Sequence, residues 1–167
     1  MFNPLKPARS RATILAAVVL VFGLLLSGCG LLSGADAARD SSGTITSSAT
    51  ADAFSIKAGD CVIEPEGTTF TDIVAVPCGQ PHDLEAYAVT NMDDGDYPGQ
   101  QAIDDKSDEF CAAEFEKFIG ISFDESTLVY YPFTPTTSSW QGGDREIVCV
   151  VGADKAKTVG SLQDSKK

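Results

Sequence analysis

Short runs of apolar and β-branched residues, separated by turn residues, predict five β-strands in the second part of the chain. Runs of this length bounded by glycine, proline or aspartate are typical of strands. Pro65-Glu66-Gly67 marks a turn between the first two runs, and Gly79-Gln80-Pro81 separates the second from the third. The predicted strands are 61–63, 70–76, 84–90, 128–133 and 146–151.

Residues 100–119 follow a helical period instead of an alternating one. Pro98 precedes the segment, acidic residues occupy its early turns, and Gly120 follows as a C-cap, all of which favour a helix. One apolar stripe about 140° wide runs along this helix. It consists of Ile103, Phe110, Cys111, Phe115 and Phe118. The order βββ-α-ββ predicts an α+β domain: a small antiparallel sheet with one packed helix.

The first 28 residues predict a lipoprotein signal peptide. Lys6, Arg9 and Arg11 give a positive start, and residues 12–26 form an apolar run of 15 residues. That run is shorter than the roughly 20 residues a spanning helix needs. Leu26-Ser27-Gly28-Cys29 resembles the lipobox of bacterial lipoprotein precursors, in which the cysteine thiol receives a diacylglyceryl group and the chain is cut before it. The alternatives are a plain secretory signal or an uncleaved anchor.

Three segments follow the signal peptide in this interpretation. Residues 29–53 are the lipidated cysteine and a flexible linker, since Gly, Ser, Thr and Ala fill 17 of the 24 positions from 30 to 53. Residues 54–154 form the folded domain. Residues 155–167 are a polar, lysine-rich tail that we expect to be frayed. With four lysines and one aspartate, this tail could fold back onto an acidic domain or lie near the membrane surface.

The charge of the predicted domain narrows the classes of partner. Residues 54–154 contain 20 acidic and 4 basic residues, a net charge of −16. A nucleic-acid binder needs a basic face, so that class is excluded. Such a field also disfavours anionic lipid headgroups and wall polymers, and it favours a cationic partner. The alternative explanation of the charge is solubility alone.

Four cysteines remain if Cys29 carries lipid. An even number of cysteines in an exported domain indicates disulfides. Of the three possible pairings, Cys61–Cys78 and Cys111–Cys149 join elements that should be neighbours, so we expect these two. A four-cysteine zinc site is disfavoured because its ligands normally come in close pairs, and here the spacings are 17, 33 and 38 residues. No metal or other cofactor is therefore expected.

The turn Pro81-His82-Asp83-Leu84-Glu85 carries the only histidine of the chain. His82 could be a general base, or a metal ligand together with Asp83 or Glu85. A general base requires a nucleophile, and the sequence has no Gly-x-Ser-x-Gly elbow and no free cysteine to supply one. We therefore favour a turn histidine whose ring bonds a backbone carbonyl. The acidic loop 93–96 offers oxygen ligands for calcium, but it lacks the EF-hand pattern.

A second turn, Trp140-Gln141-Gly142-Gly143-Asp144-Arg145, holds the only tryptophan and one of the four bases of the domain. Trp140 is either a cover for the edge of the core, which we favour, or an exposed recognition residue. Arg145 should be paired among so many carboxylates. We expect Asp83 or Glu85 to be its partner, which would brace the His82 turn.

These segments together resemble the septum-formation domain family of actinobacterial envelope proteins, whose members are often lipid-anchored or membrane-anchored. The resemblance covers about residues 54–152. It rests on the segments Cys-x-x-Pro-His-x-x-Glu from Cys78 to Glu85 and Trp-x-x-Gly-Asp-Arg from Trp140 to Arg145, with Gly59-Asp60-Cys61, Cys111 and Cys149 around them. It implies a link to septum formation at cell division.

Our main hypothesis is a lipoprotein without enzymatic activity, anchored on the extracytoplasmic face of the membrane, whose acidic domain binds another envelope protein. A ligand- or cation-binding module outside the cytoplasm is the alternative. An enzyme of wall metabolism ranks last, since such hydrolases need a zinc site, an activated cysteine or a distinct carboxylate pair.

Overall fold

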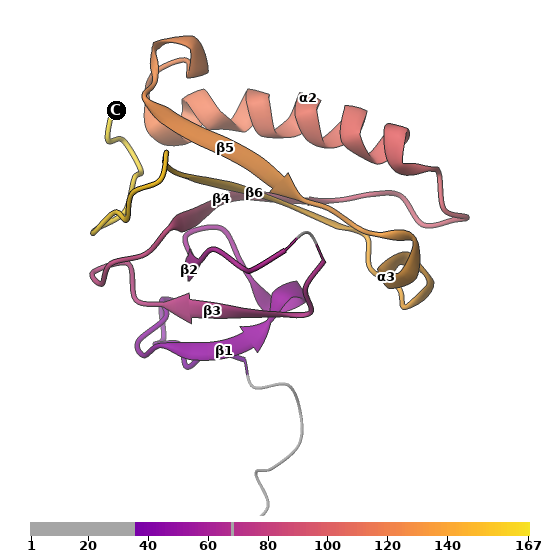
Figure 1. Ribbon diagram of the computed structural model, residues 1–167, viewed down its shortest axis with the longest axis horizontal. Helices are drawn as coiled ribbons and strands as arrows, with labels where there is room; N and C mark the ends of the chain where they lie inside the picture. The colour runs from indigo at the N-terminus through magenta and orange to yellow at the C-terminus, as the bar shows by residue number, and fades with distance from the viewer. Residues whose placement is uncertain (1–35, 68) are drawn as a thin grey trace, which may run out of the picture. The chain divides into compact units, whose positions relative to one another are not determined.

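The computed structural model describes residues 36–67 and 69–167 of the chain (Figure 1). The strands of this part are β1 (Ala49–Asp52), β2 (Cys61–Ile63), β3 (Asp72–Val76), β4 (Leu84–Asn91), β5 (Leu128–Phe133) and β6 (Glu146–Ala153). The helices are α2 (Gln100–Ile119) and α3 (Thr137–Gln141), and short 3-10 helices occupy Ala53–Ser55 and Phe123–Glu125.

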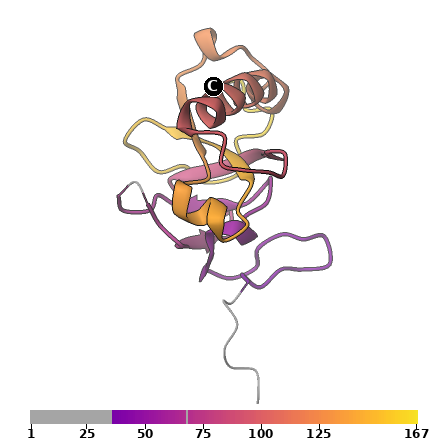
Figure 2. The same cartoon turned by 90° about the vertical axis from the view of Figure 1, so that its right-hand side faces the viewer.

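The strands form one antiparallel sheet in the order β1-β3-β2-β4-β6-β5. In the long ladder between β4 and β6, Glu85 lies opposite Val151 and Asn91 lies opposite Glu146. Helix α2 covers one face of β4, β5 and β6, while β1 and β3 lie on the side away from α2 (Figures 1 and 2). The predicted α+β fold, an antiparallel sheet with one packed main helix, is confirmed.

Side chains that alternate along β6 separate two apolar clusters. Ile147, Cys149 and Val151 face α2, where Phe115 and its neighbours on the helix pack against them. Val148 and Val150 face the other way, into a cluster shared with the N-terminal strands. The sheet is therefore buried on both faces, although a single helix covers only one of them.

The N-terminal strands can cover the second face because the sheet curls. Strands β3 and β5 are four positions apart in the sheet, which would separate them by about 19 Å if it were flat. Phe70, just before β3, nevertheless contacts Phe133 at the end of β5, with the ring centroids 4.9 Å apart in an edge-to-face arrangement. One end of the curled sheet is thus drawn together by two aromatic rings.

Two disulfides connect neighbouring elements of this fold. Cys61 of β2 is bonded to Cys78, two residues after β3, and Cys111 of α2 is bonded to Cys149 of β6. The expected pairing is confirmed. Because Cys111 and Cys149 are both fully buried, the second bond fixes the helix to the middle of the sheet.

The expectation of a flexible linker up to residue 53 differs from the structure in residues 36–53. Ala37 and Ile45 are buried in the core, and β1 pairs with β3 along its whole length. Arg39 donates two hydrogen bonds of 2.6 Å to the carboxylate of Asp60, a buried residue. Small side chains hid this segment in the sequence, because alanine and threonine give little hydrophobic period while their backbone pairs like any other.

The expectation of a frayed tail at 155–167 is wrong as well. Leu162 is buried against α2, and the N–H groups of Asp164 and Lys166 donate to carbonyls of Phe118 and Ile119 at the end of α2. A single apolar residue in a polar segment is a weak signal, so this contact could not be predicted from the residue pattern. The tail folds back onto the domain, which is one of the two placements its positive charge allowed.

Candidate functional site

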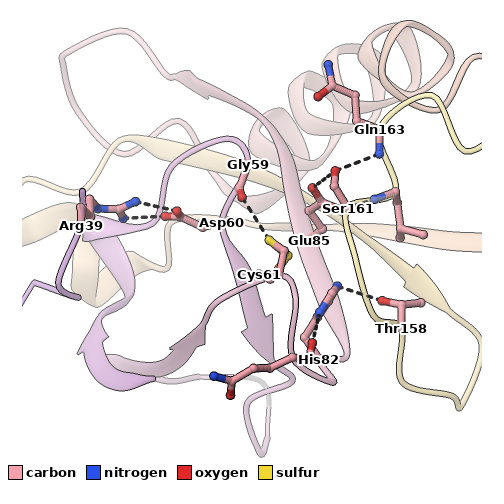
Figure 3. The surroundings of a disulfide bond; sticks show 12 residues. Arg39, Gly59, Asp60, Cys61, His82, Glu85, Thr158, Ser161 and Gln163 are labelled. Carbon is pink, nitrogen blue, oxygen red and sulfur yellow. Dashed lines mark hydrogen bonds and ion pairs between the residues drawn. A yellow bond between two sulfur atoms is a disulfide. The ribbon is translucent and has the colours of Figure 1, made fainter. Parts of the chain in front are cut away.

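The His82 turn is a structural junction. The ring is fully buried, with Nδ1 2.8 Å from the carbonyl oxygen of Gln80 and Nε2 2.9 Å from Oγ1 of Thr158 (Figure 3). A carbonyl only accepts, so Nδ1 donates to Gln80, while Nε2 shares a hydrogen bond with the Thr158 hydroxyl. Both ring nitrogens are thereby used to hold the chain. The predicted bond from the ring to a backbone carbonyl is confirmed.

The two carboxylates beside His82 bind the C-terminal segment. Glu85 is buried and accepts hydrogen bonds of 2.6 Å from the Ser161 hydroxyl and from the N–H of Leu162 (Figure 3). Asp83 accepts from the ammonium of Lys157 at 2.6 Å. Burial acts to raise the pKa of Asp83, but the bonds from Lys157 and from the Glu64 N–H outweigh it and lower that pKa.

The two sulfur atoms nearest to this turn are used in a disulfide. The Cys61 and Cys78 sulfurs lie close to the Glu85 carboxylate, but they are bonded to each other and are not thiolate ligands. The backbone of the turn approaches β6 so closely that a Cβ at Gly152 would lie 2.2 Å from the Asp83 carbonyl oxygen. The segment from Cys78 to Glu85 therefore works as an anchor for residues 156–166.

The expected pairing of Arg145 with Asp83 or Glu85 is wrong. Because Asn91 lies opposite Glu146 and Glu85 opposite Val151, the two turns lie at opposite ends of the β4–β6 ladder, about 20 Å apart. In Figure 1, α3 lies at one end of β6 and the C-terminal segment lies at the other. Each turn is close in sequence to a disulfide, which shows that both belong to the same domain. It does not show at which end of the sheet each turn lies.

Arg145 instead stacks on Trp140. Its guanidinium carbon lies 3.8 Å from the centroid of the indole ring, and Nη1 donates to the carbonyl oxygens of Trp140 and Asp144. The Arg145 Nε lies 3.5 Å from an Asp94 carboxylate oxygen, whose side chain is 98% exposed. Cation–π stacking and backbone bonds thus hold this arginine in place.

Trp140 covers the edge of the core, as favoured from the sequence. It lies on α3 and is 5% exposed, and its indole N–H donates to the Gly95 carbonyl oxygen at 3.0 Å. Helix α3 itself was not predicted; a capping box formed by Thr136 and Ser139 starts it, with serine in place of the usual Glu or Gln. Asp144 accepts from the Ser139 hydroxyl and from the Glu146 N–H, which fixes the turn between α3 and β6.

A groove of about 1450 Å³ opens at the end of the curled sheet next to this turn. The ends of β4 and β5, the start of β6, and the segments around the start of β3 and the end of β1 form its walls. Its lining combines aromatic rings with polar groups, principally Phe54, Phe70, Phe133, Asn91, Arg145 and Glu146. The groove thus combines a concave shape with mixed apolar and polar chemistry.

Glu146 gives the groove its electrostatic character. Its Oε2 is buried and accepts no hydrogen bond from the described residues. Burial, and secondarily the charge of Asp144, raise the pKa of the Glu146 carboxyl. Arg145 is adjacent in sequence but is stacked on Trp140 and forms no ion pair with Glu146 among the described residues; its own Nε is also buried without a hydrogen-bond partner.

Sequence analysis did not single out Glu146. The sequence did contain one indication. Side chains alternate along a strand, so positions 146, 148 and 150 of β6 point to one face, and Val148 and Val150 are buried there. Glu146 begins this inward-facing row, so its carboxylate is directed toward the same side as the two valines. The chain's only histidine and its four disulfide-bonded cysteines are engaged as described above, so they do not contribute free side chains to the groove.

The expected lipidation site, Cys29, and the expected signal peptide, 1–28, lie outside the described residues. Helices capable of crossing a membrane, by their length and apolar character, were not found in residues 36–67 and 69–167.

Comparison with known proteins gives one match. The sequence model of the septum formation family matches residues 27–166, which extends past the expected bounds at both ends and includes β1 and the C-terminal segment. Comparison with curated proteins and with solved structures gave no match. With a match across nearly the whole length and the fold described above, the chain belongs to the septum formation family.

Proposed function

We propose that this protein is an extracytoplasmic lipoprotein, anchored in the membrane through Cys29, whose folded domain binds another envelope protein during septum formation and catalyses no reaction. The observation that carries the proposal is the family match over residues 27–166, which links the whole folded domain to cell division. The lipobox-like segment Leu26-Ser27-Gly28-Cys29 supports the anchor, because acylation at a cysteine there gives stable attachment.

Three features support binding rather than catalysis. The residues of the His82 turn that resemble acid–base groups are used to hold the C-terminal segment. The four cysteines of the domain are oxidised and are not nucleophiles. The groove, in contrast, offers an open surface of aromatic rings and one unpaired carboxylate, which is the kind of lining that recognises a partner.

The experiment that tests this function compares cells that lack the gene with cells that carry the wild type or the Cys29→Ser variant. We expect the deletion to delay or misplace septa in time-lapse imaging, and the wild type to restore them. The Cys29→Ser protein should leave the detergent phase, accumulate as the uncleaved precursor and restore division poorly. Normal septa in the deletion strain would contradict the septal role, and unchanged partitioning with normal cleavage would contradict the anchor.

A second candidate function is the binding of a small cation or other small ligand. The unpaired Glu146 carboxylate in the groove, near the acidic loop of residues 93–96, favours it. Titration of the protein with calcium in a calorimeter separates the two functions. Heat that saturates at one site per chain supports the second candidate, and its absence leaves the protein partner as the function to pursue.

A further inference from the structure

The floor of the groove continues an apolar row of the core and ends it with a carboxylate. Phe133 and Val89 lie on either side of Val148 in the sheet, and Glu146 is the next residue of β6 on the same face, with Asn91 opposite it. A chain segment lying along this row would therefore meet aromatic and aliphatic side chains first and Glu146 at the open end. A segment bound here would therefore need apolar side chains along the row and a positive group at the open end.

Most of the charged side chains around the open end are acidic and favour a positive group. Asp93 and Asp94 belong to the loop that rims the groove, and Asp144 precedes Glu146. Arg145 is the basic side chain of the described lining, and its guanidinium is held by Trp140 and two carbonyl oxygens. Glu146 lines the groove and its buried Oε2 has no donor, so a positive group that reaches the Glu146 carboxylate from the groove would supply one.

The apolar side of the groove indicates that the occupant is larger than an ion. The Phe54 side chain is 50% exposed at the rim, and the Phe70–Phe133 pair lies beside it. Exposed aromatic rings beside a carboxylate match a peptide that carries a basic residue flanked by large apolar side chains.

We propose that the groove receives an extended segment of a partner protein, with a lysine or arginine side chain bonded to Glu146 and apolar neighbours packed on Phe54, Phe70 and Phe133. The proposal rests on the proposed function, because it gives the partner surface of the same domain a position and a chemistry. It commits to a cationic peptide, in agreement with the net charge of −16 over residues 54–154.

The test uses the detergent-solubilised full chain and two fluorescent pentapeptides, capped at both ends. One has the sequence Gly-Phe-Lys-Phe-Gly, and in the other norleucine replaces lysine, which keeps the length and removes the charge. We expect the lysine peptide to bind at least about tenfold more tightly, since a charge-assisted hydrogen bond is the difference between them. Equal affinity of the two peptides would overturn the proposal.

Variants of the chain locate the interaction. Glu146→Gln should reduce affinity for the lysine peptide about tenfold and leave the norleucine peptide unchanged, whereas Glu109→Gln, on the exposed side of α2, should change neither. Phe54→Ser should weaken both peptides several-fold, and this exposed position is safe for the fold. Full affinity for the lysine peptide in Glu146→Gln would overturn the assignment of the groove.

Other occupants give different outcomes in the same assay. Butylamine that competes as tightly as the lysine peptide would show a small-amine site and overturn the peptide assignment. A wild-type dimer in sedimentation that Glu146→Lys dissociates would assign the groove to a second copy of the chain. If Glu146→Gln restores septa in the deletion strain while the peptides fail to bind, this inference fails and the septal function stands. Normal septa in the deletion strain would reject that function whatever the peptides do.

Discussion

Buried polar side chains in this domain fall into two groups. Asp60, His82 and Glu85 are each satisfied by groups from distant parts of the chain. Three buried side-chain atoms have no hydrogen-bond partner among the described residues: Arg145 Nε, Glu146 Oε2 and Ser165 Oγ. Glu146 Oε2 belongs to a carboxylate that lines the groove, and its burial without a donor costs folding free energy.

This difference predicts that Glu146→Gln stabilises the folded domain. Burial and the nearby Asp144 raise the pKa of Glu146, so the folded state disfavours its ionised form. The stability that protonated Glu146 contributes is present below the unfolded pKa of about 4.3 and is lost as pH rises through the higher folded pKa. In thermal unfolding at pH 7 the variant should melt about 2 °C above wild type.

The comparison at low pH checks the cause. At about pH 3.5 the wild-type carboxyl is protonated in both states, so the two melting temperatures should converge. Glu109→Gln, which removes an equal but exposed charge, measures the general effect of reducing net negative charge. A Glu146→Gln variant that melts no higher at pH 7 than this control would show that the carboxylate is satisfied in solution.

Glu85 makes the opposite prediction. Glu85→Ala removes the acceptor of the Ser161 hydroxyl and of the Leu162 N–H, which leaves a buried donor unpaired and should cost about 2 kcal/mol. The melting temperature should fall by about 5–10 °C. Amide hydrogen exchange should accelerate across residues 158–166. A lower melting temperature with unchanged exchange in that segment would contradict its role as the anchor of the C-terminal segment.

Sequence reasoning identified the right turns and half of their roles. It selected His82 and Trp140 as structural residues, and the structure confirms both. It could not find the partners of Asp83 and Glu85, because Lys157 and Leu162 lie in a segment without a hydrophobic period. Glu146 was missed because one carboxylate among 20 in the domain has no distinguishing mark until its face of the sheet is known.

Elements with a clear period were predicted closely. Helix α2 and strands β2 and β5 have the bounds that the sequence indicates, since the helix presents a periodic apolar stripe and each strand presents an apolar run between turn residues. Strand β1 and helix α3 were missed, as β1 consists of alanine, threonine and aspartate and α3 is five residues long. Both elements are formed by tertiary contacts, to β3 and to Gly95 respectively.

The lengths of the loops that the two disulfides close predict which bond stabilises the domain more. The Cys111–Cys149 bond closes a loop of 38 residues and Cys61–Cys78 one of 17. Loop-closure entropy assigns them about 4 and 3 kcal/mol respectively. Replacing both cysteines of a pair by alanine should lower the guanidinium midpoint in each case, and more for Cys111 with Cys149. An unchanged midpoint for either double variant would contradict a stabilising role for that bond.

The whole molecule joins an acidic body to a basic C-terminal segment that it binds itself. The tail with four lysines contacts the body through Lys157 and Asp83 and through backbone bonds at His82 and at the end of α2. Part of the positive charge of the C-terminal segment is therefore paired within the domain. The electrostatic field around the rest of the domain stays strongly negative. A partner that approaches the groove meets this field before it meets Glu146, which favours basic segments over acidic ones.

The central claim is that the groove is the surface through which this family member contacts another envelope protein at the septum. Site-specific photo-crosslinking in dividing cells tests it most directly, with the probe at Thr134 in the groove lining or at Glu109 on the exposed side of α2. We predict one adduct with an envelope protein from Thr134, lost when Glu146→Gln is added, and none from Glu109. The same adduct from both positions, or its persistence in the Glu146→Gln background, would contradict the claim.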